Sequence, residues 1–283
     1  MRTQPPTAHP LDALAIAAPL TARNDRDIAG QNRPSRLNPR RWLQPAVFDF
    51  WARHFNRTWS AERILARVIE RRTASSRATT LVLKPNRHWP GARAGQHLDV
   101  IVELQGVRHR RSYSLSAPPR ADGSIEITVA ELEGGRVSPV LACATRIGDV
   151  LELSAPYGGL CFPVTAGAPA LLLAAGSGIT PLRALLLDAL AKGETRPITL
   201  LYWAQTRDEL CFRDELLRLA RQHPNLHVEF LLTRDPAAPA ARISSGQLQA
   251  LAPDLSRFDV LACGPDGFIA RARELCASAR GFQ

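Results

Sequence analysis

The feature that most constrains the fold is residues 171–181, with the sequence LLLAAGSGITP. A run of small and apolar residues over 170–175 is typical of a strand buried on both faces of a sheet. Gly176 and Gly178 break this run, and Pro181 opens an apolar helix over 182–190, since proline suits the first helical turn. The start of such a helix offers unpaired N–H groups to an anion, typically a pyrophosphate. An ordinary tight strand-to-helix turn explains the same residues without a ligand.

The chain of 283 residues is 45% hydrophobic, enough for a large core that divides most naturally into two domains. No apolar run approaches the ~20 residues of a membrane span, and we recognise no signal peptide. The five cysteines are scattered, which suggests a reducing, cytoplasmic location. No spacing of Cys or His is typical of a zinc or iron–sulfur site, so we expect no metal centre.

The net charge of +10 is unevenly distributed, because residues 1–72 hold 13 Arg against 6 Asp and Glu. A basic excess indicates nucleic acid, an anionic membrane or an acidic protein as partner. No nucleic-acid fold motif is present, and aromatic residues are not interleaved with the arginines as single-strand binders require. We therefore expect no nucleic-acid binding.

The N-terminal region divides into two parts. Residues 1–40 show no hydrophobic periodicity and predict a mobile basic tail. Residues 41–60 predict a helix in which Phe48, Trp51, Phe55 and Trp59 share one face. We expect this face to dock on the following domain; contact with a partner or a membrane surface is the alternative.

Residues 61–166 are rich in short alternating segments with Gly, Asp and Pro between them. Even spacing of this kind predicts a small antiparallel β-barrel of about six strands. The expected strands are 64–72, 79–84, 97–104, 107–116, 124–129 and 150–154, with one helical patch at 138–144.

Residues 167–283 alternate between strands and helices, which predicts a doubly wound parallel sheet. The expected strands are 170–175, 198–204, 228–233 and 259–262, and the expected helices are 182–190, 209–222, 245–251 and 268–278. The Ala, Gly and Pro residues at 165–169 mark the expected domain boundary. The predicted fold class is thus β followed by α/β.

Alternation on the strand 107–116 places Arg111, Tyr113 and Leu115 on one face and the serines on the other. Alone, this pattern is equally typical of an ordinary polar strand. Four motifs in order make it more specific: Arg111-x-Tyr113-Ser114, Gly134-Gly135-x-x-Ser138, Gly176-x-Gly178-x-x-Pro181 and Cys263-Gly264-Pro265.

Over roughly residues 62–280 this ordered set resembles the ferredoxin–NADP reductase family. The similarity is greatest to reductases whose short N-terminal extension contains a Trp/Phe helix. Such reductases often carry a plant-type iron–sulfur domain at the C-terminus and serve oxygenases or fatty-acid desaturases. The resemblance implies a flavin-binding barrel followed by an NAD(P)-binding domain.

For the flavin, the resemblance implies that the Arg111 fork meets the pyrophosphate. It implies that Tyr113 lies against the isoalloxazine ring and that Ser114 hydrogen-bonds near N5, where hydride arrives. Backbone N–H groups after Gly135 and the Ser138 hydroxyl hold the same pyrophosphate, which favours FAD over FMN. Ser138 is equally explained as a helix N-cap ahead of proline. The remaining implied flavin contacts are Thr128, Ala130 and Val137.

For the pyridine dinucleotide, the resemblance implies binding along Gly176, Gly178, Thr180 and Pro181, with Thr180 close to both nicotinamide and flavin. It places Cys263 beside the nicotinamide C4. Without the resemblance, this cysteine is as well explained as a small buried residue. Gly264 and Pro265 complete this edge of the sheet. The implied catalytic residues are Ser114, Thr180 and Cys263.

The choice of coenzyme depends on the residues after strand 198–204, where NADP sites present arginine. Arg207 and Arg234 are available to the 2′-phosphate, which favours NADPH, with NADH as the alternative. Many relatives have arginine where Gln205 stands. Thr206 and Glu209 form the pattern of a capping box, which needs no ligand.

Two features depart from the family pattern. The usual Pro-x-Gly-x-Phe reads Pro156-Tyr-Gly-Gly-Leu160, so the phenylalanine is absent or displaced to Phe162. We also expect too few residues after the last helix to build the family's last strand, although Phe282 lies there. The electron acceptor is then a separate protein, or the chain is shortened.

Together these features predict transfer from NADPH through FAD to an acidic one-electron carrier: a ferredoxin, a flavodoxin or the 2Fe-2S protein of an oxygenase or desaturase system. The basic surface would steer such a carrier. The alternative is a flavin- or nucleotide-binding electron-relay or redox-sensing subunit without turnover. A third hypothesis makes the N-terminus a peripheral membrane anchor.

Overall fold

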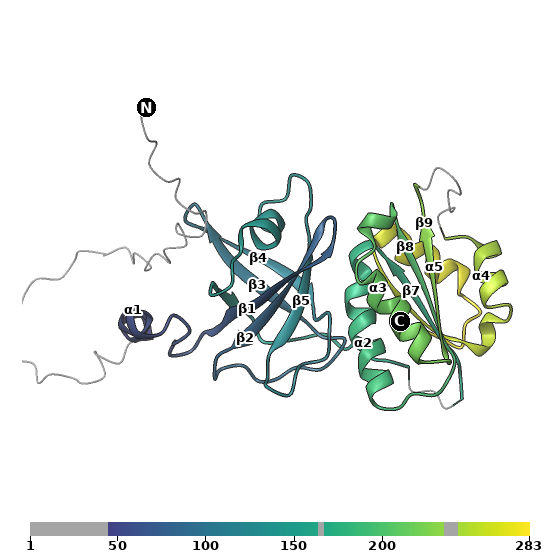
Figure 1. The fold of residues 1–283 in the computed structure, drawn as a ribbon, viewed down its shortest axis with the longest axis horizontal. Coiled ribbons are helices and arrows are strands. Elements are labelled where there is room, and N and C mark those ends of the chain that lie inside the picture. Colours follow the sequence, from purple (N-terminus) through teal and green to yellow (C-terminus); the bar gives the residue numbers. More distant parts are fainter. Residues whose placement is uncertain (1–44, 164–166, 235–242) are drawn as a thin grey trace, which may run out of the picture.

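The computed structural model describes residues 45–163, 167–234 and 243–283. The predicted tail at 1–40 lies outside these residues, as does part of the predicted boundary at 165–169. Figure 1 shows two domains side by side, with helix α1 (Pro45–Phe55) on the side of the first domain that faces away from the second.

The first domain is an antiparallel six-stranded sheet that closes into a barrel, as predicted. Its strand order is β4-β3-β6-β1-β2-β5, and a bridge between Leu115 and Ile127 joins the two edge strands. Alternate residues of the strands fill the interior with aliphatic side chains. A π-helical turn, η2 (Val140–Ala144), matches the predicted helical patch. The strands are β1 (Ile64–Ser75), β2 (Ala78–Pro85), β3 (His97–Leu104), β4 (Val107–Ser114), β5 (Ile125–Ala130) and β6 (Val150–Leu153).

The second domain is a parallel sheet with helices on both faces, which confirms the doubly wound prediction. Its strand order is β11-β10-β7-β8-β9. The elements are β7 (Ala170–Ala175), α2 (Ile179–Ala191), β8 (Ile198–Ala204), α3 (Arg213–Gln222), β9 (Leu226–Leu232), α4 (Ser245–Leu251), β10 (Asp259–Cys263), α5 (Asp266–Leu275) and β11 (Gly281–Phe282), with 3₁₀ turns η3 (Gly176–Gly178), η4 (Arg207–Glu209) and η5 (Leu255–Arg257).

Strand β7 is the centre of this sheet. Leu172 and Ala174 pack with α2 and α3, whereas Leu171 and Leu173 pack on the opposite face with α4 and α5. Both faces of the strand are therefore covered, as the run of apolar residues predicts.

The predicted capping box at Thr206 and Glu209 is wrong. No side chain caps η4 at Thr206, and the Glu209 carboxylate lies 4.0 Å from Arg77 of the barrel. The chain leaves the turn η4 at Leu210, which is extended with φ of −66° and ψ of 105°, and Phe212, in a left-handed conformation with φ of 60°, precedes the next helix. Helix α3 accordingly begins at Arg213, later than predicted.

The predicted docking of the aromatic face of α1 is also wrong. Phe48, Trp51, Phe55 and Trp59 are 41%, 61%, 81% and 53% exposed. The helix is held from its other side, where the buried Asp49 carboxylate accepts hydrogen bonds from Ser60, the Ala61 N–H and Arg63. Directional bonds to one carboxylate fix the helix with its aromatic face outward.

The prediction that too few residues remain for a last strand is wrong as well. Strand β11 pairs in parallel with β10, and Phe282 packs against the core on the α5 side. Helix α5 ends at Leu275, earlier than the predicted 278, so the chain has enough residues to return to the sheet.

The two domains are joined by backbone hydrogen bonds as well as by side chains. The Ser76 N–H donates to the Asp208 carbonyl over 2.8 Å, and the Phe212 N–H donates to the Ala74 carbonyl over 3.3 Å. The tip of the β1–β2 hairpin thus contacts the loop that follows β8.

Candidate functional site

The nucleotide half of the predicted site lies where the sheet changes direction. Chain order runs from β7 outward to β8 and β9 on one side, and β10 lies on the other side of β7. Ligands of such sheets bind at this switch point, outside the carboxyl ends of the strands. The glycine loop η3 follows β7, and Cys263 ends β10, so the structure brings these two motifs together.

Gly178 shows how closely the two motifs approach. A Cβ at this position would lie 2.1 Å from the Cys263 carbonyl oxygen and 2.6 Å from the Gly264 nitrogen. Only glycine fits such an approach. Gly176, in contrast, has φ of +55°, and a Cβ placed there would meet nothing within 4 Å, so its face of the loop is open to a ligand.

Thr180 is buried, and its hydroxyl donates to the Ser177 carbonyl over 2.9 Å. Pro181 lies in the first turn of α2, which begins two residues earlier, at Ile179. The turn η3 runs directly into α2, because the Ile179 N–H donates to the Gly176 and Ser177 carbonyls, so the first N–H groups of this continuous helical start are those of the glycine loop itself. Thr180 therefore shapes the loop through its hydroxyl.

Cys263 is half-buried, and its burial raises the thiol pKa to about 11. The side chain is therefore a neutral thiol at physiological pH. Gly264 follows it, where a Cβ would lie 2.9 Å from that of Ala175, and Pro265 leads into α5. The predicted residues at the end of β10 thus fit tightly around the end of β7.

The flavin half of the predicted site lies on β4. Arg111 is exposed, and its guanidinium donates to the Arg110 carbonyl over 2.8 Å, which leaves most of its donors to solvent. Tyr113 packs on the barrel core, and burial raises its pKa to about 12 against the opposing charge of Arg111. The phenol is therefore neutral. Ser114 pairs with His97 of β3 at the end of the strand.

The second phosphate motif precedes η2. A Cβ on Gly135 would lie 2.8 Å from the Ser138 Oγ and 2.9 Å from the Leu132 carbonyl oxygen, so this turn also requires glycine. The Ser138 Oγ accepts the Leu132 N–H over 3.0 Å. The N-cap explanation of Ser138 is wrong by one residue, because Ser138 is already helical and the Leu141 N–H bonds to the Val137 carbonyl. Val137 is buried in the barrel core.

Two predicted flavin contacts on β5 differ in exposure. Thr128 is buried, and its hydroxyl bonds to those of Thr80 and Ser116. Ala130 is exposed at the end of the strand. Strand β5 also lies against η3, so the glycine loop of the second domain lies beside the flavin barrel.

The two predicted 2′-phosphate residues lie on neighbouring loops. Arg207 follows β8, and Arg234 follows β9, which is paired with β8. The Arg234 N–H donates to the Gln205 carbonyl over 2.9 Å, and both arginine side chains are exposed. The structure thus places two cations at the same edge of the sheet.

Sequence reasoning missed Arg183 of α2, which is 4% exposed. Its guanidinium lies between the domains and bonds to the Ser116 carbonyl, to Glu126 and to Glu215. The available signal was an arginine near the start of the otherwise apolar run 182–190, since arginine is seldom buried without partners.

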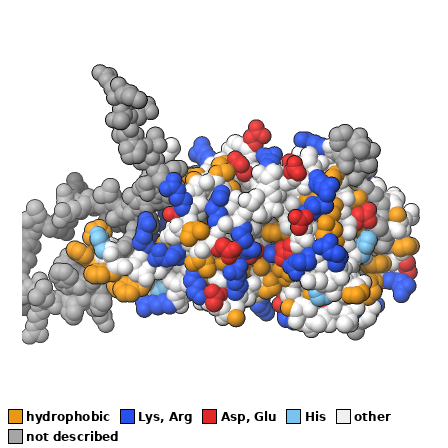
Figure 2. Space-filling model, viewed as in Figure 1, with side chains coloured by type: hydrophobic (Ala, Val, Ile, Leu, Met, Phe, Trp, Pro, Cys, Tyr) orange, Lys and Arg blue, Asp and Glu red, His pale blue; other side chains and the backbone are white. Residues whose placement is uncertain are grey.

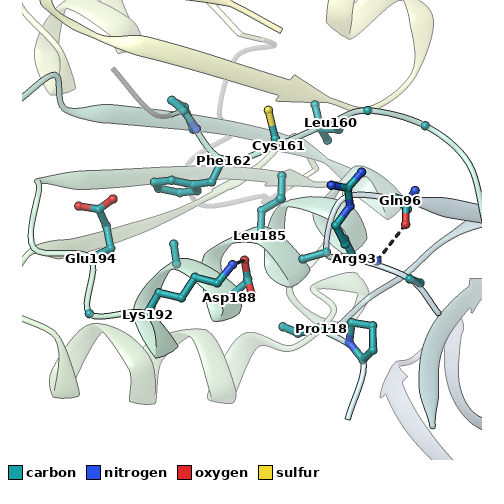
Figure 3. Close-up of a pocket in the computed structure, with 18 of the residues that line it drawn as sticks. Arg93, Gln96, Pro118, Leu160, Cys161, Phe162, Leu185, Asp188, Lys192 and Glu194 are labelled. Carbon is teal, nitrogen blue, oxygen red and sulfur yellow. Dashed lines mark hydrogen bonds and ion pairs between the residues drawn. The ribbon is translucent and has the colours of Figure 1, made fainter. Parts of the chain in front are cut away.

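A cavity of about 870 Å³ lies between the barrel loop 92–96, the segment 158–163 and the C-terminal half of α2 (Figure 3). In Figure 3, Lys192 pairs with Asp188, while Arg93 and Phe162 face the cavity from the other segments. None of the predicted cofactor residues lines it.

Among the described residues, no helix is long and apolar enough to cross a membrane. The same residues contain no group of His, Cys, Asp and Glu that is arranged to hold a metal ion.

Residues 66–162 match the family described as oxidoreductase FAD-binding domain, and residues 172–274 match the oxidoreductase NAD-binding domain. An NADPH oxidoreductase of Mycobacterium tuberculosis is 29% identical over 241 residues, which cover 83% of this chain and 62% of that protein. Ferredoxin–NADP reductase B of Sorangium cellulosum is 30% identical over 198 residues, which cover 66% of this chain and 80% of that protein.

Among solved structures, the FAD/NAD-binding domain of a nitric oxide dioxygenase from Vibrio cholerae superposes with a TM-score of 0.68 at 26% identity. The match covers 77% of this chain and 93% of that one. The chain thus spans about three fifths of the Mycobacterium protein and nearly all of the Vibrio domain pair.

Proposed function

Since the chain belongs to the ferredoxin–NADP reductase family, with its FAD-binding and NAD(P)-binding domains, we propose that it passes electrons from NADPH through FAD to a separate one-electron carrier protein. The observation that supports this most directly is the contact of Gly178 with Cys263 beside the flavin barrel. This contact supports the proposal because it brings the glycine loop against the strand end that carries the half-buried Cys263.

The residues of the barrel fit a flavin dinucleotide. The exposed Arg111 fork and the tight turn at Gly135 offer two places for phosphate oxygens. Tyr113 is a neutral aromatic ring held on the core, and Ser114 is at the end of the same strand. Bound FAD would accept two electrons and a proton from NADPH as hydride and release the electrons singly.

The residues of the second domain orient the nucleotide. The open face at Gly176 and the start of α2 bind its pyrophosphate, and Thr180 holds the loop in shape. Cys263 excludes water from the nicotinamide position and remains a neutral thiol. Arg207 and Arg234 attract the 2′-phosphate, which favours NADPH over NADH.

The carrier would be a small acidic protein of the ferredoxin, flavodoxin or 2Fe-2S kind. The sequence carries a net charge of +10, and Figure 2 shows Lys and Arg side chains over both domains on the face in view. Opposite charge speeds encounter, and salt screens this effect. Turnover with a carrier should therefore fall as ionic strength rises.

The test is anaerobic mixing of the FAD-loaded protein with NADPH and, separately, with NADH. Loss of the flavin absorbance near ~450 nm, faster with NADPH, would support the proposal. A protein that binds FAD but is reduced by neither nucleotide would instead be a relay or sensing subunit. A protein that takes up no FAD would contradict both functions.

A further inference from the structure

The buried side chain of Arg183 is bonded to both domains at once. Toward the second domain, its Nε and Nη2 donate to the two carboxylate oxygens of Glu215 over 2.8 and 3.0 Å. Toward the barrel, its Nη1 donates to Glu126 over 2.8 Å and to the Ser116 carbonyl. The Phe212 ring lies 4.2 Å from the guanidinium carbon.

The bonds of Arg183 fix the relative orientation of its carboxylate partners as well as the contact between the domains. A guanidinium presents its donors in one rigid plane, so its two carboxylate partners cannot shift relative to each other without breaking bonds. A buried ion pair often stabilises a fold no more than apolar residues of the same size would. The useful property of this cluster is then the geometry that it imposes.

The partners of Arg183 lie close in sequence to both halves of the site. Arg183 is one turn into α2, the helix that begins directly after the glycine loop. Ser116 follows Ser114 by two residues, and its hydroxyl contacts Thr128 and lies 3.4 Å from Glu126. The guanidinium therefore connects the start of the nucleotide helix to the strand that carries the predicted flavin residues.

We propose that Arg183 is a positioning residue that sets the spacing between the nucleotide, whose pyrophosphate is held at Gly176–Gly178, and the flavin held at Tyr113 and Ser114. Hydride transfer requires the reacting atoms to approach within ~3–3.5 Å, and a displacement of about 1 Å costs roughly a hundredfold in rate. This inference rests on the proposed function, because it concerns the transfer step.

The test compares Arg183→Lys with Arg120→Lys. Lysine keeps the charge but has a single point donor, so it loses the fork. Arg120 is the matched control, because it lies 3.6 Å from the same Glu126 carboxylate but belongs to the barrel alone. We expect Arg183→Lys to bind FAD and NADPH within about threefold of the unchanged protein and to reduce its flavin about 10- to 100-fold more slowly. Arg120→Lys should keep the original rate.

A purely structural role for Arg183 would lower the melting temperature and the flavin content without slowing reduction per bound flavin. An unchanged rate per bound flavin in Arg183→Lys would overturn the proposal. A rate loss of the same size in Arg120→Lys would also overturn it, because that variant leaves the second domain untouched.

Hydrogen–deuterium exchange gives a second measurement that needs no turnover. In Arg183→Lys, peptides that cover 110–117 and 176–186 should exchange faster in both domains, and in Arg120→Lys the 176–186 peptide should not change. If neither nucleotide reduces the unchanged protein, the proposed function fails, and the exchange comparison still decides the domain contact. Unchanged exchange of both peptides in Arg183→Lys would overturn the inference.

Discussion

The two halves of the candidate site differ in how far the fold alone fixes their geometry. In the nucleotide half, the backbone at Gly178 touches the backbone at Cys263, and no side chain fits between them. In the flavin half, the exposed Arg111 guanidinium donates to the carbonyl of the neighbouring Arg110. The contact at Gly178 is therefore set before any ligand binds, whereas the guanidinium of Arg111 depends on a ligand for most of its hydrogen bonds. A substitution at Gly178 should accordingly damage the geometry of the site, and one at Arg111 should lower the affinity for the cofactor.

The largest effect is expected for Gly178→Ala. The added Cβ would overlap the Cys263 carbonyl, so the loop must move by about an ångström, and we expect flavin reduction by NADPH to slow by at least about a hundredfold. FAD binding should be retained. Rapid-mixing absorbance measures both. Gly246→Ala, at an exposed position of α4 where a Cβ would meet nothing within 4 Å, is the control and should be unchanged. A normal rate in Gly178→Ala would show that the two motifs do not share one site.

Arg111→Ala should weaken FAD binding by roughly 10- to 100-fold, as expected for the loss of charge-assisted bonds worth about 1.5–3 kcal/mol. The melting temperature of the flavin-free protein should not change, because the side chain is exposed. Titration of the flavin-free protein followed by fluorescence measures the affinity. Arg108→Ala on the same strand, where Arg108 pairs with Glu152, is the control. Equal losses in the two variants would contradict a specific role for Arg111.

Arg207→Ala and Arg234→Ala should each lower kcat/KM for NADPH about tenfold and leave the value for NADH nearly unchanged, because only NADPH carries the 2′-phosphate. Steady-state rates with an artificial acceptor give both values. Arg218→Ala, on the exposed side of α3, should change neither. Loss of activity with both nucleotides alike would mean that these arginines do not select the coenzyme.

The smallest effect concerns the thiol of Cys263. Because burial raises its pKa to about 11, the reactive thiolate is scarce at pH 8 and increases about tenfold per pH unit toward pH 10. Alkylation by iodoacetamide, followed by mass spectrometry of the Cys263 peptide, should follow that slope. The exposed Cys161 serves as the reference thiol within each sample. A rate at Cys263 that is already constant above pH 8 would indicate an ordinary or lowered pKa.

Much of the fold could be predicted because some stretches of the sequence are compatible with only one structural environment. The strands 170–175 and 198–204 are matched to the residue, since uninterrupted apolar runs fit only a sheet covered on both faces. The two glycine-containing motifs on either side of β7 were also identifiable. Their steric contact was not, because it depends on which strands become neighbours.

The errors arose where a polar group outside the local pattern decided the outcome. The aromatic residues of α1 predict a docked face, but Asp49 and its partners at 60–63 hold the opposite face. The interdomain bonds of Arg183 join residues 57 and 67 positions apart in sequence. The hydrophobic periodicity of a single helix does not identify partners so distant in sequence.

The hairpin tip at Ala74 and Ser76 has a consequence for how the protein unfolds. Its backbone bonds to the loop at 208–212 are of the kind that normally join elements within one domain. Such bonds do not depend on side-chain identity. If one domain unfolds, the backbone groups of the other domain that made these bonds, and the partners of the buried Arg183, lose their hydrogen bonds. We therefore expect the barrel and the parallel sheet to unfold in one cooperative transition, and we expect either domain produced alone to be less stable than it is in the whole protein.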